Sequence, residues 1–232
     1  MGSARWQRFL ELIEAEPDDL SEAAKICAVA SSLLDGHSSS IGVVVDGFYS
    51  AIAAAGDLAV VMDEAQFQIG DGPVFDVQRS NIPIVIGDTL SHSTAERYPA
   101  LTEVTAANQI RSLAAFPLRA GVESTGSLTV YREIPGELSA DQFADGLVAA
   151  SFALAEIVNS RAGVIGVDRA LGFQPNQFGS SHLQIAAGMV AEALGCSIVE
   201  SLVRIRAHAF AVGEPVSVVA RRITEREFML KP

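Results

Sequence analysis

The sequence predicts an α+β protein with a strand-rich N-terminal part, in which helices are interspersed, and an all-helical C-terminal part. The strands are predicted first by two extended runs, Ser40 to Val45 and Phe48 to Ala55, because the Asp46-Gly47 pair between them is typical of a tight β-hairpin. The helical part is predicted by three short helical patterns that follow residues 172–181, a stretch with the Gly, Pro, Asn and Ser content of a linker. We therefore expect two structural units joined by a linker.

The other N-terminal elements follow from hydrophobic spacing. Residues 6–34 carry apolar side chains at helical intervals, with a break at Pro17. Residues 59–69 have a mixed pattern that favours no element. Pro73 suits the first turn of a short helix. Three further strands are expected, with a polar helix between the first and the second: Ile82 to Ile86, Ser112 to Leu118 and Ser127 to Tyr131.

The Gly70-Asp71-Gly72-Pro73 turn is a candidate binding feature, because backbone N–H groups at a helix start can hold an anion. Asp71 and Asp76 beside it could also pair as a general acid and base. A Gly-rich turn is a weak signal, however, and carboxylates in so acidic a chain are usually solvated. We expect an ordinary turn before a helix.

A long helix is expected from Ser139, a plausible N-cap with Gln142 at the capping-box position, to about residue 170. One stripe of apolar residues runs along it at spacings of four and three: Phe143, Leu147, Ala150, Leu154 and Ile157. The stripe exceeds what one sheet face needs from an edge helix. We therefore expect a homodimer built largely on residues 139–171.

Charge separates the two parts of the chain. The 232 residues have a net charge of −12, which argues against a protein whose whole surface coats nucleic acid or anionic membrane. Residues 1–180 hold 10 basic and 23 acidic residues, whereas residues 181–232 hold 6 and 5. Only the C-terminal part, at net +1, would not broadly repel a polyanion.

Neither catalysis nor metal binding is indicated. Cys27 and Cys196 form no CxxC pair, and the four histidines show no helical ligand spacing. A nucleophile elbow and a Walker A loop are also missing. We therefore expect no enzyme, no metal and no cofactor. The N-terminus lacks a signal h-region and no apolar run reaches about 18 residues, so a cytoplasmic protein without membrane contact is expected.

The cations of the C-terminal helices differ in local context. Arg204 lies four residues after Glu200, the spacing of a surface ion pair on a helix. Arg206 falls between two apolar arcs of the same helix, which predicts a packed stem with its guanidinium at a rim or an interface. Arg221 and Arg222 are expected to open the last helix, against its macrodipole, so that local stability does not explain them.

Four motifs stand out in the C-terminal segment: Ala186-Ala-Gly-Met-Val, Leu194-Gly-Cys-Ser, the helix from Glu200 to Phe210 with its Arg-Ile-Arg-Ala core, and Val216-Ser-Val-Val-Ala220. With these motifs the segment resembles an ANTAR domain, the three-helix RNA-binding module of transcription antitermination regulators. It implies a module that acts as a dimer on paired stem-loops in nascent transcripts. Together with the local contexts above, it suggests these RNA-binding residues: Gly188, Arg204, Arg206, His208, Arg221 and Arg222.

Four segments of the N-terminal part also form a recognisable set: Gln66 to Pro73, Ile82 to Asp88, Ile110 to Leu118 and Gly126 to Tyr131. In these segments the chain resembles the GAF domain found ahead of ANTAR in actinobacterial regulators. The resemblance implies an antiparallel sheet with flanking helices over 1–160, the helix end and linker at 161–181, and the ANTAR domain at 182–232. For the GAF interior we expect a mainly apolar ligand pocket, lined by Val43, Ile52, Phe75, Ala115 and Val130.

Three functions compete. The first is a cytoplasmic RNA-binding regulator of transcription termination, gated by a ligand-sensing GAF domain. The second is a dimeric sensing or protein-interaction module whose tail has lost RNA binding, which Ile185 and Ala187 favour because many relatives carry polar residues there. The third is an enzyme or haem sensor, for which His92 would be the axial ligand. Val74 replaces a cysteine common after the Gly-Pro turn, so Cys27 alone could anchor a bilin or support sulfoxide reductase chemistry.

Overall fold

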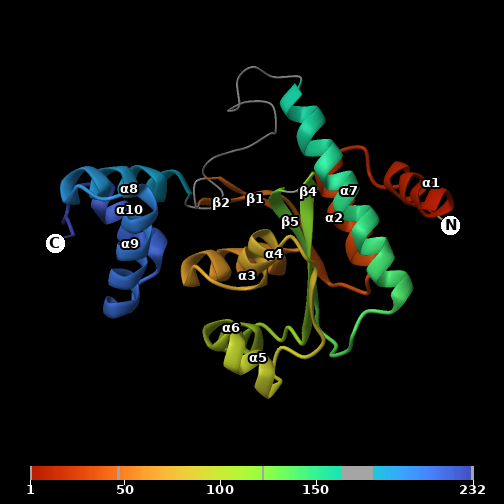
Figure 1. The fold of residues 1–232 in the computed structure, drawn as a ribbon, viewed down its shortest axis with the longest axis horizontal. Helices are drawn as coiled ribbons and strands as arrows, with labels where there is room; N and C mark the ends of the chain where they lie inside the picture. Colours follow the sequence, from red (N-terminus) through yellow and green to blue (C-terminus); the bar gives the residue numbers. More distant parts are fainter. Residues whose placement is uncertain (1, 46–47, 122, 163–179, 231–232) are drawn as a thin grey trace.

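The computed structural model describes residues 2–45, 48–121, 123–162 and 180–230. Five antiparallel strands form one sheet in the order β2-β1-β5-β4-β3, seen close to edge-on in Figure 1. The strands are β1 (Ser38–Val45), β2 (Phe48–Ala55), β3 (Ile84–Ile86), β4 (Ser112–Ala120) and β5 (Glu123–Arg132). The predicted pairing of the first two strands is confirmed, because Val45 lies opposite Phe48.

One face of the sheet is covered by helices and holds the main apolar core. Helices α2 (Glu22–Leu33) and α7 (Ala140–Ala162) pack on this face, and α1 (Gly2–Glu14) packs on both of them (Figure 1). Alternate residues of β4 and β5, including Phe116, Leu128 and Val130, point into this core and are fully buried. Burial of this apolar surface is the main driving force for the fold of the N-terminal unit.

Helix α7 begins with the predicted capping box, since the Ser139 hydroxyl accepts from the Gln142 amide and the Gln142 side chain accepts from the Ser139 amide. The apolar stripe of the helix lies in the core: Ala150 and Ile157 are buried, and Phe143 and Leu154 are packed against the sheet core. Of the stripe, Leu147 alone is exposed, at 41%. The stripe therefore does not exceed what the core needs from this helix, contrary to the expectation, and it leaves little apolar surface for the expected dimer contact.

The opposite face of the sheet is covered by α3 (Asp57–Ile69), which lies over β1 and β2, and by α4 (Pro73–Ser80), which lies over β4 and β5. Figure 1 shows both helices on the side of the sheet away from α2 and α7. Helices α5 (His92–Arg97) and α6 (Pro99–Ala107) follow the edge strand β3. A second apolar cluster joins α3 and α6 to the sheet through Met62, Leu101 and Leu113.

The C-terminal unit consists of α8 (Ser180–Leu194), α9 (Ile198–Val212) and α10 (Val216–Thr224), and has its own apolar core. Arg221 and Arg222 lie in the last turn of α10, where the negative end of the helix dipole stabilises positive charge. The expectation that they open this helix is therefore wrong. No single helix in the described ranges is long and apolar enough to span a membrane. Helices α8 and α9 meet that requirement only as a pair, which is bent by 104°.

Candidate functional site

A buried polar cluster lies between α3 and the sheet. Asp63 and Gln66 stand one turn apart on the inner side of α3, and Ser40 of β1 and Tyr131 of β5 face them. The hydroxyls of Ser40 and Tyr131 donate to Asp63 Oδ1 at 2.9 and 2.7 Å, and Gln66 Nε2 donates to Tyr131 Oη at 3.0 Å. We call these four residues the sheet-face cluster. Its members are almost completely buried, so their hydrogen bonds are made in a low-dielectric interior.

Three further hydroxyls on the same face of the sheet have no hydrogen-bond partner among the described residues. Ser38 lies opposite Tyr131 in the strand pairing, Thr129 lies opposite Ser40, and Ser127 continues the same alternation along β5. All three side chains are buried, at 1% exposure or less. A buried hydroxyl without a partner costs roughly 1–3 kcal/mol, so such groups usually meet a ligand or an ordered water.

Replacing Thr129 by valine should therefore leave the protein as stable as before or raise its unfolding free energy, by about 1 kcal/mol. Valine keeps the shape of the side chain and removes the unpaired hydroxyl. Thr89 provides the matched control, because its equally buried hydroxyl donates to the Ile110 carbonyl at 2.6 Å. Thr89→Val should lose about 1 kcal/mol or more in urea denaturation. Equal losses for both variants would mean that the Thr129 hydroxyl is satisfied.

The turn before α4 is held by the sheet-face cluster. Gln66 Oε1 accepts from the Val74 amide at 3.1 Å, and the amides of Phe75 and Asp76 donate to the Gly72 carbonyl at 3.0 Å. Gly72 is required at this turn, since its φ is +135° and an added Cβ would lie 2.5 Å from Gln66 Oε1. These first-turn amides are therefore occupied, and the anion site considered for this turn is not formed.

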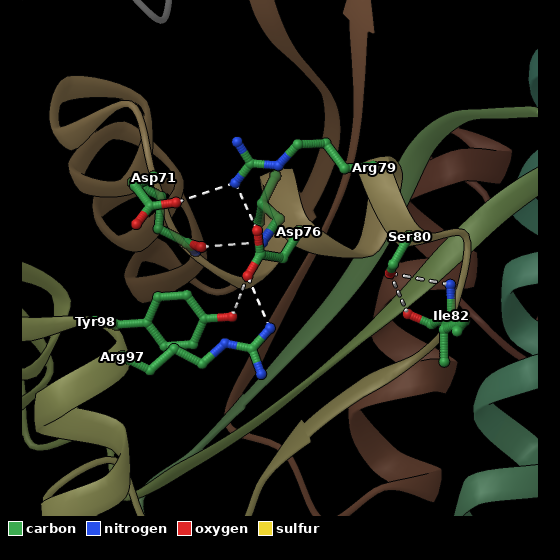
Figure 2. Close-up of polar contacts among 9 residues, drawn as sticks. Asp71, Asp76, Arg79, Ser80, Ile82, Arg97 and Tyr98 are labelled. Atoms are coloured by element: carbon green, nitrogen blue, oxygen red, sulfur yellow. Dashed lines mark hydrogen bonds and ion pairs between the residues drawn. The ribbon is translucent and has the colours of Figure 1, made fainter.

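Charged side chains of α4 and α5 meet beside this turn, as Figure 2 shows. Asp76 accepts from the Tyr98 hydroxyl at 2.6 Å, from Arg97 at 3.0 Å and from Arg79, which also pairs with the half-exposed Asp71. Burial raises the pKa of Asp76, but the hydrogen bonds from Tyr98, Arg79 and Arg97 outweigh it and lower that pKa below its ordinary value. Asp76 is a charged brace between α4 and α5, and an acid–base pair of Asp71 and Asp76 is not formed.

An open groove of about 680 Å³ runs along the edge strand β3. Its lining includes Thr94, Arg97 and Tyr98 from the α5 side and the segment 135–137 from the opposite side. Tyr98 faces this groove and also donates to Asp76. The groove thus offers a small molecule hydroxyl, guanidinium and backbone groups, and it is connected to α4 through the hydrogen bonds that Tyr98 and Arg97 donate to Asp76.

The five residues expected to line an apolar pocket do not lie together. Val43, Ile52 and Val130 pack in the core under α2 and α7, whereas Ala115 and Phe75 lie on the α3/α4 side. Strand alternation explains this result, because neighbouring strand residues point to opposite faces. The expected pocket is wrong in its lining, and the polar groups that gather on the α3/α4 side were not foreseen.

The residues considered for cofactor chemistry are poorly placed for it. Cys27 is completely buried in the core under α2 and α7, where burial raises the pKa of its thiol to about 12. A reactive thiolate is therefore not available at this position. His92 begins α5 with 88% of its side chain exposed and lies 3.2 Å from Glu96.

The predicted RNA-binding cations fall into two groups. His208 and Arg222 both contact the Phe228 ring, with centroid distances of 5.0 and 5.1 Å. Arg204 precedes His208 by one helical turn and pairs with Glu200, as predicted, at 2.9 Å. Arg222 pairs with Glu214 and Glu227 at 2.7 and 3.1 Å. These three basic residues therefore form one partly neutralised surface around Phe228.

The other three predicted residues lie apart from this surface or are less constrained. Gly188 on α8 has no heavy atom of the described residues within 4 Å of the position of an added Cβ, so packing does not require glycine there. Arg221 is exposed near the end of α10. Arg206 does not face Phe228: its Nε donates to the carbonyl of Phe67, in α3, at 3.1 Å. Arg206 thus lies at an interface, as its position between two apolar arcs predicted.

Comparison with known proteins gives the N-terminal unit a family. Residues 20–158 match the GAF domain, and no curated protein matches the chain. Similar solved structures include the GAF domain of a phosphoenolpyruvate-protein phosphotransferase from Coxiella burnetii, at 17% identity and a TM-score of 0.52, covering 69% of this chain and 95% of that one. The corresponding Acinetobacter domain has 14% identity and a TM-score of 0.51, covering 70% and 95%.

A third similar structure is a free methionine-R-sulfoxide reductase from Neisseria meningitidis in complex with its substrate, at 15% identity and a TM-score of 0.51. It covers 68% of this chain and 89% of that chain. At these identities the structures show a common fold: an α+β domain with an antiparallel sheet and flanking helices. Because the family match spans more than half of its residues, the chain belongs to the GAF domain family.

Proposed function

We propose that this protein is a cytoplasmic regulator that senses a small molecule through its GAF domain and binds RNA stem-loops in nascent transcripts through its C-terminal helices. The observation that supports sensing most directly is the set of three buried hydroxyls, Ser38, Ser127 and Thr129, for which the described part of the chain supplies no partner. They lie beside the sheet-face cluster, on the face that α3 and α4 cover. GAF domains bind small molecules, and a small ligand would satisfy these hydroxyls when α4 moves.

The ligand class follows from the groups that are present. Hydroxyls, one carboxylate and one carboxamide predict a small polar molecule with both donors and acceptors, whereas the sequence led us to expect a mainly apolar pocket. The groove beside Tyr98 is open to such a molecule and lies next to α4. No catalysis is proposed, since Cys27 is buried with a raised pKa and Val74 stands where a cysteine is common after the Gly-Pro turn.

The RNA-binding half of the proposal rests on the resemblance to ANTAR domains and on the basic surface around Phe228. Arg204, His208 and Arg222 lie on this surface, and a phosphate group could replace Glu200 and Glu214 as the partner of the arginines. The resemblance also implies a homodimer acting on paired stem-loops. Gating would then be a shift in the population of the binding-competent form.

A gel-shift experiment with RNA that carries two tandem stem-loops, run over a salt series, tests this proposal. Arg221→Ala and Arg222→Ala should each weaken binding and reduce the slope of log affinity against log salt, by about one unit for each phosphate that the variant no longer binds. Arg119→Ala provides the control, because Arg119 is an exposed arginine at the end of β4, in the GAF domain. If the double variant at Arg221 and Arg222 binds with unchanged affinity and slope, this surface is not the RNA site.

A protein-interaction module is the second candidate, and exposed apolar residues of the C-terminal unit favour it. Phe210 is 91% exposed, Val199 and Val203 are each 58% exposed, and Ile185 is 55% exposed. Exposed apolar side chains that gather on one unit often mark a protein interface. Absence of RNA binding by the wild-type protein, together with a dimer in light scattering, would favour this candidate over the RNA-binding regulator.

A further inference from the structure

An arginine of the C-terminal unit is held by the GAF domain. Arg206 Nε donates to the carbonyl of Phe67 at 3.1 Å, and the Arg206 guanidinium carbon lies 5.0 Å from the centre of the Phe67 ring. Gly70 ends α3 with a φ of +75°, and an added Cβ there would lie 3.1–3.2 Å from the Arg206 side chain. The last turn of α3 and its C-cap glycine therefore form the contact site of the guanidinium.

This contact site satisfies the hydrogen-bonding groups of the guanidinium only in part. Among the described residues, Nη2 of Arg206 is buried without a hydrogen-bond partner, and no carboxylate forms an ion pair with this side chain. Burial lowers the pKa of Arg206 as a result. The carbonyl end of the α3 dipole and the face of the Phe67 ring supply the compensation that exists. The free energy of the guanidinium therefore differs little between its contact with α3 and its exposure to water, because the desolvation cost offsets most of the attraction.

We propose that the contact of Arg206 with the last turn of α3 is an intramolecular lock, which keeps a polyanion-binding residue of the C-terminal unit covered by the GAF domain. The identity of the polyanion as RNA, and the role of a ligand in opening the lock, rest on the proposed function. The lock itself rests on the geometry of Arg206, Phe67 and Gly70 alone.

Gln66 connects this lock to the sheet-face cluster. Its side chain donates to Tyr131 and accepts from the Val74 amide, and its carbonyl accepts from the Gly70 amide at 2.8 Å. The next residue, Phe67, provides the carbonyl that holds Arg206. A ligand that takes over the hydrogen bonds of Gln66 would therefore shift the turn on which Arg206 is seated. Gln66 and Phe67 would thus couple ligand binding at the sheet-face cluster to the contact that holds the C-terminal unit.

Opening the lock would uncover a longer surface of α9. Val199, Val203, Arg206 and Phe210 are spaced at four, three and four residues, so they lie along one side of the helix. The two valines and Phe210 are already exposed, and Arg206 is the covered member of this row. Release would therefore add a positive charge to an apolar row with an exposed aromatic ring. Such a combination suits a single-stranded loop, in which bases stack and phosphates pair with arginine.

Gly70→Asn tests the lock in the full-length chain. Asparagine tolerates a positive φ better than most residues, but its Cβ would crowd the Arg206 side chain. Gly213→Asn is the matched control, because Gly213 is also a helix C-cap, with a φ of +69° and no described atom within 4 Å of an added Cβ. Phe67→Leu, which removes the ring but keeps an apolar side chain, provides a second variant should Gly70→Asn fold poorly.

Two readouts are needed, the radius of gyration by small-angle X-ray scattering and the dissociation constant for heparin, a generic polyanion. We expect Gly70→Asn to increase the radius of gyration and to bind heparin about tenfold more tightly, which corresponds to about 1.4 kcal/mol. Adding Arg206→Gln should abolish the gain in heparin affinity. Gly213→Asn should match the wild type in both measurements.

Unchanged heparin binding in Gly70→Asn and Phe67→Leu, whether or not the radius of gyration rises, would overturn the lock. The same holds if the gain survives Arg206→Gln, because the uncovered residue would then be another one. The tandem stem-loop RNA separates this inference from the proposed function. Tighter heparin binding without any RNA binding would leave the lock in place and reject the RNA-binding regulator.

Discussion

Asp63→Ala should lower the unfolding free energy by about 3–5 kcal/mol, one of the largest effects expected from a single polar residue in this protein. The carboxylate accepts from the hydroxyls of Ser40 and Tyr131, and all three side chains are almost fully buried. Without Asp63 both hydroxyls lose this acceptor in a site that water does not reach, and each costs roughly 1–3 kcal/mol. Loss of the desolvation penalty of the carboxylate offsets only part of this cost. Urea denaturation at constant m-value measures the change.

A double-mutant cycle with Tyr131→Phe identifies the origin of that loss. Tyr131→Phe alone removes a donor to Asp63 and an acceptor of Gln66, so it should destabilise the wild-type protein. In the Asp63→Ala background the phenol has already lost Asp63, and the same substitution should cost at least about 1 kcal/mol less. Additive losses would show that Asp63 and Tyr131 do not act as one cluster. Asp71→Ala is a suitable control, because Asp71 is a half-exposed carboxylate whose surface ion pair contributes little.

The helix that carries this cluster was missed in the sequence for a physical reason. Periodicity detects a helix by the apolar residues of its buried side. The buried residues of α3 are Ala59, Met62, Asp63 and Gln66, so half of its buried side is polar. Where the site is polar, the pattern disappears. By contrast, α9 was predicted at Ile198–Val212 and occurs there, because its buried residues are apolar.

The hydroxyl-bearing face of the sheet did leave a signal. Ser127-Leu-Thr-Val-Tyr131 alternates polar and apolar residues, and such a strand is normally interpreted as half exposed. Only the position of α3 and α4 makes its polar side a buried site. In β4 the run Leu113-Ala-Ala-Phe116 is apolar on both faces, so alternation could not assign Ala115 to a side. The lining of the pocket was therefore mistaken although the strands were predicted.

Arg221 and Arg222 were expected to open the last helix but lie in its last turn, because the helix ends earlier than its pattern predicts. The last helical pattern was expected to run to about Phe228, whereas α10 ends at Thr224 and Arg226 has a φ of +60°. A shorter helix turns the two arginines from an unfavourable position into a favourable one at the negative end of the dipole. Their position therefore has a structural explanation, and Arg222 is further held by Glu214 and Glu227. The RNA-binding proposal accordingly depends on the measured salt slope.

Gly146→Val should destabilise the GAF domain by about 3 kcal/mol or more, through the contact between α7 and the sheet. Gly146 lies against the ring of Phe116, whose Cζ atom would overlap with an added Cβ. Phe116 is completely buried at the centre of the main core, so its ring has no free space into which to move. A branched side chain at position 146 must therefore push α7 away from β4. Gly188→Val, on a helix with open space at the Cβ position, should change stability by no more than about 0.5 kcal/mol.

The single tryptophan reports whether this displacement of α7 also changes its packing against α1. The Trp6 ring lies 4.6 Å from the ring of Phe152, on α7, so separation of α1 and α7 should change the tryptophan emission of Gly146→Val but not that of Gly188→Val. Phe116→Leu makes room for the new side chain. The pair Gly146→Val and Phe116→Leu should therefore lose less stability than the sum of the two single losses, by about 1 kcal/mol or more. Strictly additive losses would mean that α7 is held by other contacts. A smaller combined loss of stability would show that Gly146 and the Phe116 ring are sterically complementary. Their contact then sets how closely α7, the helix before the C-terminal unit, lies on the sheet.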